Sequence, residues 1–186
     1  VYYYYASTLP ELFSVEDYDP LLVSEVYARN GEKIGEFYRE NRKLVPVDEI
    51  PEDLINAFLS AEDSTFYSHN GFNFKGLIRA VIANVTSGKR TQGASTSTQQ
   101  AARTLFLTSE KTYTRKIKEA IMARRMEKHL SKKDILYLYL NQIYFGQGAY
   151  GVASAAEIFF RKKVKDLTLA EMAVLAGSLT APSAYN

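Results

Sequence analysis

The chain has 186 residues, of which 46% are hydrophobic and 24% are charged, and its formal net charge is +2. This composition excludes a wholly disordered protein, and the length is enough for one domain with a substantial core. The lack of cysteine excludes disulfides and thiolate metal sites. No run of about eighteen apolar residues is present, so nothing in the sequence is expected to span a bilayer.

Positive charge is concentrated in one part of the sequence. Residues 103–133 contain ten Lys or Arg and three Glu, which leaves the rest of the chain net negative. This segregation indicates an anionic partner, such as nucleic acid, a phosphate group or an acidic membrane surface. The alternative is a solvated helix face, the usual role of a run of charges. We favour a mixture, with these residues mostly at the surface and some near anionic lipid headgroups: Arg124, Arg125, Lys128, Lys132 and Lys133.

The first fifty residues predict an extended, turn-rich segment. The tyrosines at positions 2–5 are typical of the interface just outside a membrane span, or else form an aromatic tail packed on the domain. Asn30 and Gly31 lie between apolar stretches and predict a β-hairpin, because both residue types tolerate a positive φ. Gly35 is expected to mark a bulge in that hairpin.

From residue 51 onward the sequence reads as helical almost throughout. Pro51, followed by two acidic residues, is a good helix start. Residues 88–98 are small and polar and predict a surface loop. Further helices are expected over residues 74–85, 98–106, 112–130, from 131 onward, 152–160 and 168–179. Thr168 and Glu171 have the spacing of a capping box at the start of the last one. The predicted fold class is mainly α, with one small β element at the front.

Glu62 is the first candidate for chemistry. It lies four residues after Phe58 and seven after Ile55, so it continues the apolar face of its helix and should point toward the interior or a cleft. Partial burial near the negative end of a helix raises the pKa of a carboxyl group and suits it to proton transfer near neutral pH. The alternative is a helix-end carboxylate bonded to the local backbone.

Five short motifs follow one another in the sequence. Residues 62–71 read EDSTFYSHNG, residues 92–100 read QGASTSTQQ, and residues 115–119 read RKIKE. Residues 132–146 contain Ile-Leu and Tyr-Leu-Asn at a characteristic spacing, and residues 181–186 read APSAYN. In this order the motifs resemble those of the family 51 glycosyltransferase domain, found in class A penicillin-binding proteins and in monofunctional peptidoglycan transglycosylases.

The resemblance implies a fold and a reaction. The fold would be two-lobed and mostly helical, with a lysozyme-like larger lobe and the substrate cleft between the lobes. The reaction would transfer a growing glycan chain from undecaprenyl pyrophosphate to the 4-OH of lipid II. It would invert the anomeric carbon by direct attack of the acceptor and release undecaprenyl pyrophosphate.

The resemblance also implies roles for individual residues. Glu62 would be the general base, and Glu119 would assist the leaving group directly, through Arg115, or through a divalent cation such as Mg²⁺ or Mn²⁺. The sequence itself requires no cofactor and leaves a metal site open. Asp63 and His69 would orient their neighbours. Arg103, Arg115 and Lys116 would hold the pyrophosphate, whereas Ser95, Thr96, Gln100 and Asn141 would position the sugars.

The sequence departs from the family pattern at several positions. Ala94 stands where a second glycine is usual, and Arg103 replaces a lysine that contacts phosphate. Tyr137 replaces the glutamate of the E-x-Y-L-N motif, so any role of that acid is in doubt. Because Glu62 and Glu119 are intact, we expect the chemistry to survive.

Two other functions compete with this interpretation. A lysozyme-like lytic enzyme would also use an acid at a helix end, but it needs no pyrophosphate clamp. A basic helical module that binds nucleic acid would show a salt-sensitive affinity. We expect a polymerase that works with lipid-linked substrates and the bacterial membrane surface, and not with nucleic acid.

The resemblance also predicts an organisation and a location. Residues 1–45 are assigned to an N-terminal extended and hairpin segment, and residues 46–186 to the glycosyltransferase domain. A transmembrane helix is expected before residue 1, which would anchor the domain at the outer face of the bacterial cytoplasmic membrane. Separately from the resemblance, the apolar Phe72, Phe74 and Ile78 suggest that residues 72–92 form a flap that faces the membrane.

Overall fold

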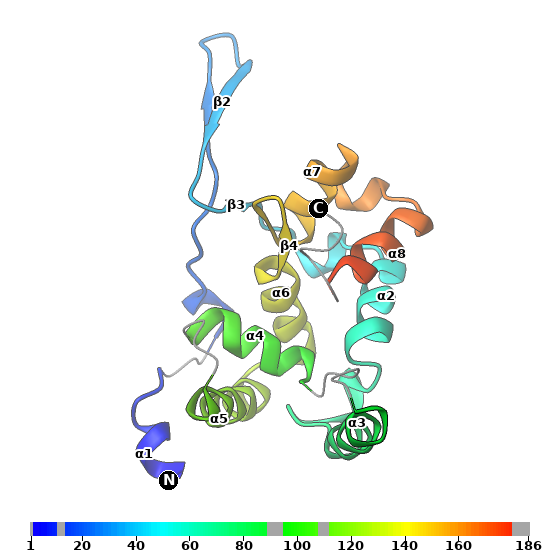
Figure 1. Ribbon diagram of the computed structural model, residues 1–186. Helices are drawn as coiled ribbons and strands as arrows, with labels where there is room; N and C mark the ends of the chain where they lie inside the picture. The colour runs from blue at the N-terminus through cyan, green and yellow to red at the C-terminus, as the bar shows by residue number, and fades with distance from the viewer. Residues whose placement is uncertain (1, 11–13, 89–94, 108–111, 180–186) are drawn as a thin grey trace. The chain divides into compact units, whose positions relative to one another are not determined.

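The computed structural model describes residues 2–10, 14–88, 95–107 and 112–179 (Figure 1). The chain forms two compact units. The first unit comprises Val1–Asp17 and Glu62–Leu136, and the second comprises Tyr18–Ala61 and Tyr137–Asn186. Both units are mainly helical, which confirms the predicted fold class.

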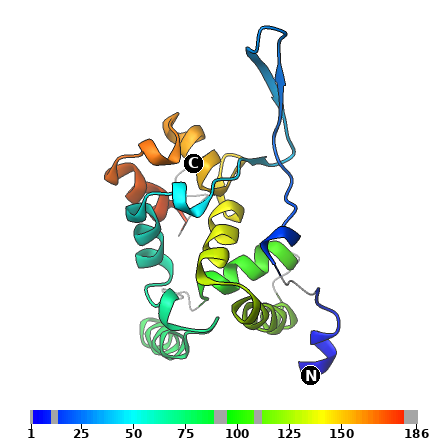
Figure 2. The ribbon, with the colours of Figure 1, turned by 180° about the vertical axis from the view of Figure 1, so that it is seen from behind.

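The second unit begins with the predicted hairpin. Strands β1 (Ser24–Tyr27) and β2 (Lys33–Phe37) are antiparallel, and Gly31 adopts a φ of +83° in the turn between them. Val26 pairs with Gly35 and Tyr27 with Lys33, so the extra residue of the bulge lies next to Gly35. The hairpin extends away from the other elements of this unit (Figures 1 and 2).

A second small sheet in this unit was not predicted. Strand β5 (Ala149–Tyr150) pairs in parallel with β3 (Asn41–Arg42) and antiparallel with β4 (Tyr144–Gly146). The expectation of a single β element was therefore wrong, because strands of two or three residues carry no readable period. Gly151 follows β5 at a φ of +79°, and a Cβ there would lie 2.7 Å from the carbonyl oxygen of Asn141. Only glycine fits this position without a shift of the backbone.

Helices make up the rest of the second unit. Helix α2 (Glu52–Glu62) starts where predicted, and all but its last residue belongs here. Its buried Phe58 packs edge-on against Phe145, with ring centroids 5.8 Å apart. Helices α7 (Gly151–Phe160) and α8 (Leu169–Ser178) match the two predicted short helices, and a short 3₁₀ turn spans Val164–Asp166. The capping box of Thr168 and Glu171 is confirmed.

The first unit contains the helices that carry most of the candidate site. They are α3 (Phe74–Ser87), α4 (Ser97–Phe106), α5 (Tyr113–His129) and the start of α6 (Lys132–Gln142). Their starts and ends lie close to the predicted ones, and Gly88 ends α3 in the left-handed conformation. Among the described residues, no helix combines the length and the hydropathy needed to cross a membrane.

The N-terminal segment differs from the extended chain that was expected. Residues Tyr2–Ala6 form the short helix α1. The Arg125 guanidinium of α5 donates hydrogen bonds to the carbonyl oxygens of Ala6 at 2.7 Å, Pro10 at 3.1 Å and Leu9 at 3.2 Å. These acceptors satisfy an arginine that is half-buried rather than at the surface.

Candidate active site

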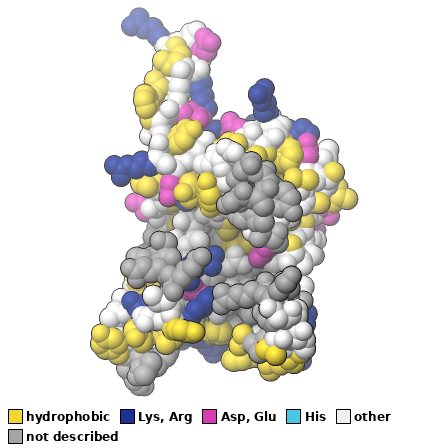
Figure 3. Space-filling view, in the orientation of Figure 1, with side chains coloured by type: hydrophobic (Ala, Val, Ile, Leu, Met, Phe, Trp, Pro, Cys, Tyr) yellow, Lys and Arg dark blue, Asp and Glu magenta, His cyan; other side chains and the backbone are white. Residues whose placement is uncertain are grey.

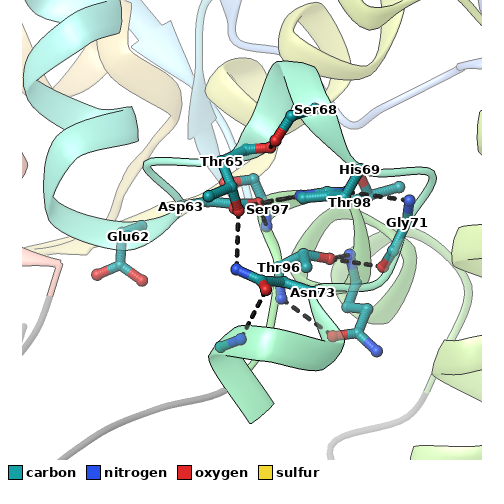
Figure 4. A network of polar contacts seen from close by, with 12 residues as sticks. Glu62, Asp63, Thr65, Ser68, His69, Gly71, Asn73, Thr96, Ser97 and Thr98 are labelled. Atoms are coloured by element: carbon teal, nitrogen blue, oxygen red, sulfur yellow. Dashed lines mark hydrogen bonds and ion pairs between the residues drawn. The ribbon is translucent and has the colours of Figure 1, made fainter. Parts of the chain in front are cut away.

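Two neighbouring acids at the end of α2 have different surroundings. Glu62 is half-buried, whereas Asp63 is only 6% exposed. The Glu62 carboxylate points away from the polar network that surrounds Asp63 (Figure 4). One of these acids is therefore accessible for chemistry, while the other is used inside the fold.

Asp63 links the first motif to the second. Its carboxylate accepts a hydrogen bond from the backbone N–H of Ser97 at 2.9 Å and another from Nε2 of His69 at 2.9 Å. Nδ1 of His69 in turn accepts the N–H of Gly71 at 3.1 Å, so a neutral imidazole carries its proton on Nε2. Ser97 is the first residue of α4, and a carboxylate there interacts favourably with the helix dipole. This geometry fits the supporting role predicted for Asp63 and His69.

Thr96 caps helix α4. Its hydroxyl oxygen accepts the N–H of Gln99 at 3.2 Å and donates to the carbonyl oxygen of Gly71 at 2.9 Å. Gln99 completes a capping box through the N–H of Thr96. Residues 96–98 are buried, so the prediction of a solvated surface loop over 88–98 was wrong at its end. Residues 89–94, which include Ala94, lie outside the described part of the chain.

Gln100 holds Glu62. Its amide Nε2 donates a hydrogen bond to Oε2 of Glu62 at 2.9 Å. This contact joins two residues separated by 38 positions in the sequence. The alternative interpretation of Glu62 was a bond to local backbone, and among the described residues this carboxylate makes none. In the described part of the chain the other oxygen of Glu62 has no hydrogen-bond partner, so it is available for a proton.

Glu119 is a buried carboxylate between two cations. It is 1% exposed and forms ion pairs with Arg115, one helical turn away, and with Nζ of Lys116 at 2.6 Å. Both partners lie on α5 with it, at spacings that bring helical side chains together. A buried charge needs such partners, because desolvation without compensation is costly. Lys116 also donates to the hydroxyl of Ser95 at 2.9 Å, which ties α5 to the second motif.

The structure brings together two of the three predicted pyrophosphate ligands. Arg115 and Lys116 meet at Glu119, as described above. Arg103 lies on α4, half-buried, and makes no ion pair with a carboxylate in the part of the chain that the structure describes. Its guanidinium is therefore not neutralised by a described acid.

Asn141 does not fit the predicted contact with a sugar. It belongs to the second unit and its side chain is completely buried. Its amide donates to the carbonyl oxygens of Val45 at 3.0 Å and Tyr137 at 2.9 Å, and its oxygen accepts the N–H of Val45 at 2.9 Å. Both amide hydrogens are thus used by the backbone. Thr96 likewise has its hydroxyl hydrogen committed to Gly71.

Glu127 and Lys132 form a polar cluster that sequence reasoning missed. Oε1 of Glu127 accepts from Nζ of Lys132 at 2.8 Å and from the hydroxyl of Thr98 at 2.7 Å. Lys132 also donates to the carbonyl oxygen of His69 at 2.7 Å and lies 4.4 Å from the centre of the Phe66 ring. Lys132 was expected at the surface, but it fastens the first motif to α5 and α6. Within the described ranges, no group of three or more His or acidic side chains is placed to hold a metal.

Comparison with known proteins agrees with this arrangement of motifs. The transglycosylase family matches residues 30–186. The chain belongs to the transglycosylase family. Penicillin-binding protein 1A of Neisseria lactamica is 51% identical to it over 178 residues, which are 96% of this chain and 22% of that protein. Penicillin-binding protein 1A of Escherichia coli K12 is 45% identical over 186 residues, all of this chain and 22% of that protein.

This transglycosylase chain thus spans about a fifth of the length of the curated relatives it matches, at 22% of each. The family match covers every motif that the sequence analysis used. It also covers Glu62, Gln100 and Glu119, the residues with the most distinctive surroundings.

Proposed function

We propose that this transglycosylase domain polymerises peptidoglycan. The donor is a growing glycan chain on undecaprenyl pyrophosphate, and the acceptor is the 4-OH of lipid II. The acceptor oxygen attacks the anomeric carbon of the donor, the bond from that carbon to the pyrophosphate oxygen breaks, and the configuration inverts. The acceptor proton passes to Glu62, and undecaprenyl pyrophosphate leaves.

The surroundings of Glu62 support its role as the base. A base must reach the proton that it removes and must be held in one orientation. Glu62 is half-buried and bonded to Gln100 through one oxygen, whereas Asp63 is buried and committed to Ser97 and His69. This contrast between adjacent carboxylates is the observation that carries the proposal.

The surroundings of Glu119 support an indirect role. This carboxylate is buried and its charge is compensated by Arg115 and Lys116. It is therefore suited to orienting these two side chains rather than to exchanging a proton. We assign the pyrophosphate to Arg115 and Lys116, with Arg103 as a third cation. Hydrogen bonds from charged donors to phosphate oxygens stabilise the charge that develops on the leaving group. A lytic enzyme, whose leaving group is a sugar hydroxyl, has no use for such cations.

Helix α3 supports a reaction at a membrane surface, where lipid-linked substrates lie. Hydrophobic side chains gather over α3 in the lower part of Figure 3. The most exposed are Val85 at 76%, Phe74 at 70% and Ile78 at 61%. An exposed apolar face of this kind indicates contact with a membrane or another protein. We propose that it contacts the bilayer that carries the substrates.

The test is polymerisation of labelled lipid II by the purified protein and its variants. Glu62→Gln should reduce turnover by roughly 10²–10⁴, the usual contribution of a general base. Glu52→Gln, an exposed acid at the start of the same helix, serves as the matched control and should leave turnover unchanged. Full activity of Glu62→Gln would refute the mechanism, and cleavage of finished peptidoglycan in place of polymerisation would favour the lytic alternative.

A further inference from the structure

The second unit contains a hollow that the proposed reaction does not use. Its volume is about 520 Å³, within the usual range for ligand sites. Its lining combines four apolar residues, Leu44, Val45, Ala153 and Val164, with nine charged ones. One wall comes from the hairpin and residues 43–45, which follow β3, together with Glu49, and the other from α7 and the segment 161–165.

The two walls differ in their charge balance. On the hairpin side, Lys43 pairs with Glu157 at 2.5 Å and with Glu36 at 3.1 Å, and Lys33 pairs with Glu25 at 2.9 Å. These cations are therefore compensated by acids of the same unit.

The opposite wall is only partly compensated. Arg161, Lys163 and Lys165 are exposed, line the hollow, and make no ion pair with any carboxylate that the structure describes. Lys162, between them, is paired with Glu171 at 2.8 Å. Three cations without an acidic partner among the described residues thus lie along one side of the hollow, near its apolar residues.

Arg161 has a second unusual property. It ends α7 in the left-handed conformation, with φ 55° and ψ 37°. Glycine or asparagine usually takes this position, because a larger side chain is strained there. The backbone conformation alone favours glycine here, yet the residue is an arginine. A residue type that does not suit its own backbone conformation is typical of a functional position.

The composition of the hollow restricts its ligand. Six cations line the hollow against three acids, Glu25, Glu49 and Glu157, so its charge favours an anionic ligand; a compact anion such as free phosphate, however, has no apolar group to place against Leu44 and Val45. A flat bilayer surface cannot follow a concave wall. None of the lining residues described is aromatic, so nucleic-acid bases have no surface to stack on.

We propose that this hollow is a docking site for an extended acidic segment of a partner protein. The segment places a hydrophobic side chain against Leu44, Val45 and Val164, and its carboxylates pair with Arg161, Lys163 and Lys165. Charge complementarity indicates an acidic partner, because Arg161, Lys163 and Lys165 make no ion pair with a described carboxylate. The hollow belongs to the second unit, whereas Glu62 and Glu119 belong to the first, so docking is separate from the proposed chemistry.

The test measures fluorescence anisotropy of a labelled eight-residue peptide that contains five Asp or Glu residues around a central leucine. The whole protein should bind it saturably and more weakly at high salt. The triple variant Arg161→Gly, Lys163→Gln and Lys165→Gln should bind about tenfold more weakly, as expected for the loss of three exposed ion pairs. Replacing the peptide's carboxylates by amides, or its leucine by serine, should also weaken binding.

A matched variant controls for net charge. This triple variant carries Arg29→Gln, Arg124→Gln and Lys128→Gln, which remove three exposed cations that do not line the hollow. It should bind the peptide as the wild type does. Equal weakening in this control, or no saturable binding by the wild type, would overturn the proposal. Competition by inorganic phosphate or by phosphatidylglycerol vesicles at matched ionic strength would assign the cations to a phosphate ligand instead.

Discussion

The carboxylate of Asp63 lies 2.9 Å from the backbone nitrogen of Ser97, which connects the end of α2 to the first turn of α4. A second hydrogen bond links the same two helices, because Gln100, about one turn after Ser97 in α4, donates to Glu62, the residue before Asp63. The position of the proposed base therefore depends on a buried hydrogen bond made by the residue next to it.

Replacing Asp63 should lower both stability and activity. Oδ2 of Asp63 accepts from both Ser97 N–H and His69 Nε2, and Oδ1 lies 3.1 Å from the same His69 Nε2. In Asp63→Asn an amide oxygen in the place of Oδ2 would leave the amide nitrogen, a second donor, facing His69 Nε2. Hydrogen bonds to charged groups contribute about 1.5–3 kcal/mol, and we expect a loss in this range in urea unfolding. Asp53→Asn, an exposed acid of the same helix, should change stability by less than about 1 kcal/mol. An unchanged unfolding midpoint for Asp63→Asn would show that the contact is not important.

Replacing Gln100 should distinguish base positioning from sugar binding. Gln100→Ala removes the donor that holds Glu62, so turnover should fall about tenfold while KM changes little, since the interaction matters mainly in the transition state. Steady-state kinetics with labelled lipid II separates the two parameters. A large rise in KM at unchanged kcat would instead assign Gln100 to the substrate, as the sequence analysis expected.

The unfolding of Glu171→Gln should depend on pH. The hydrogen bond from Lys162, together with the backbone N–H of Thr168, lowers the pKa of Glu171 from its ordinary value of 4.5 to about 2. Its contribution to stability is therefore present above pH 4.5 and is lost as the pH falls toward 2. The thermal midpoint of Glu171→Gln should lie below that of the wild type at pH 7, and the two should converge near pH 2.

The control for this measurement is Asp19→Asn, which removes one exposed negative charge from the same unit. A difference between wild type and Glu171→Gln that persists at pH 2 would show that the glutamine disturbs the capping box itself, not only the charge.

Arg161→Gly should stabilise the protein. Glycine adopts the left-handed conformation without the strain that arginine has there, and we expect a gain of about 0.5–1 kcal/mol in chemical denaturation. Gly88→Ala is the reverse experiment at the left-handed end of α3, where a Cβ meets no neighbour within 4 Å, and it should destabilise by a similar amount. Destabilisation by Arg161→Gly would mean that the arginine side chain supports the fold.

Replacing the exposed apolar residues of α3 should weaken membrane binding. The triple variant Phe74→Ser, Ile78→Ser and Val85→Ser should reduce binding to vesicles of phosphatidylglycerol and phosphatidylcholine by about tenfold or more, given the transfer free energy of such side chains. The control is a triple variant with Tyr113→Ser, Leu169→Ser and Val174→Ser, which removes exposed apolar residues on other helices. Its binding to vesicles should change little. Unchanged vesicle binding by the α3 variant would exclude the membrane-facing flap.

Local patterns in the sequence were sufficient for most of the helices and for the hairpin. Apolar periodicity, the Thr168 capping box, Gly88 after α3 and Asn30-Gly31 act over a few residues, so each can be recognised from its neighbours alone. The motifs likewise identified the transglycosylase family, because their residues and order are visible without a structure.

Contacts across long stretches of chain required the tertiary structure. Asn141 and Thr96 were taken for sugar ligands because they are polar residues within motifs, but their partners are the backbones of Val45 and Gly71. The surface position expected for Lys132 was wrong for the same reason, since its acceptors on Glu127 and His69 cannot be inferred from a run of charges.

The sequence by itself determined the helical class, the family and the candidate acids Glu62 and Glu119, because these depend on residue type and spacing. Only the tertiary structure decided that Asp63 is committed to the fold and that Glu119 is buried, whereas the helical spacing alone indicates its pairing with Arg115. The physical reason is that burial and hydrogen-bond donors from distant segments determine whether a carboxylate is free to react or held by the fold. Those donors come within hydrogen-bond distance only when the chain folds.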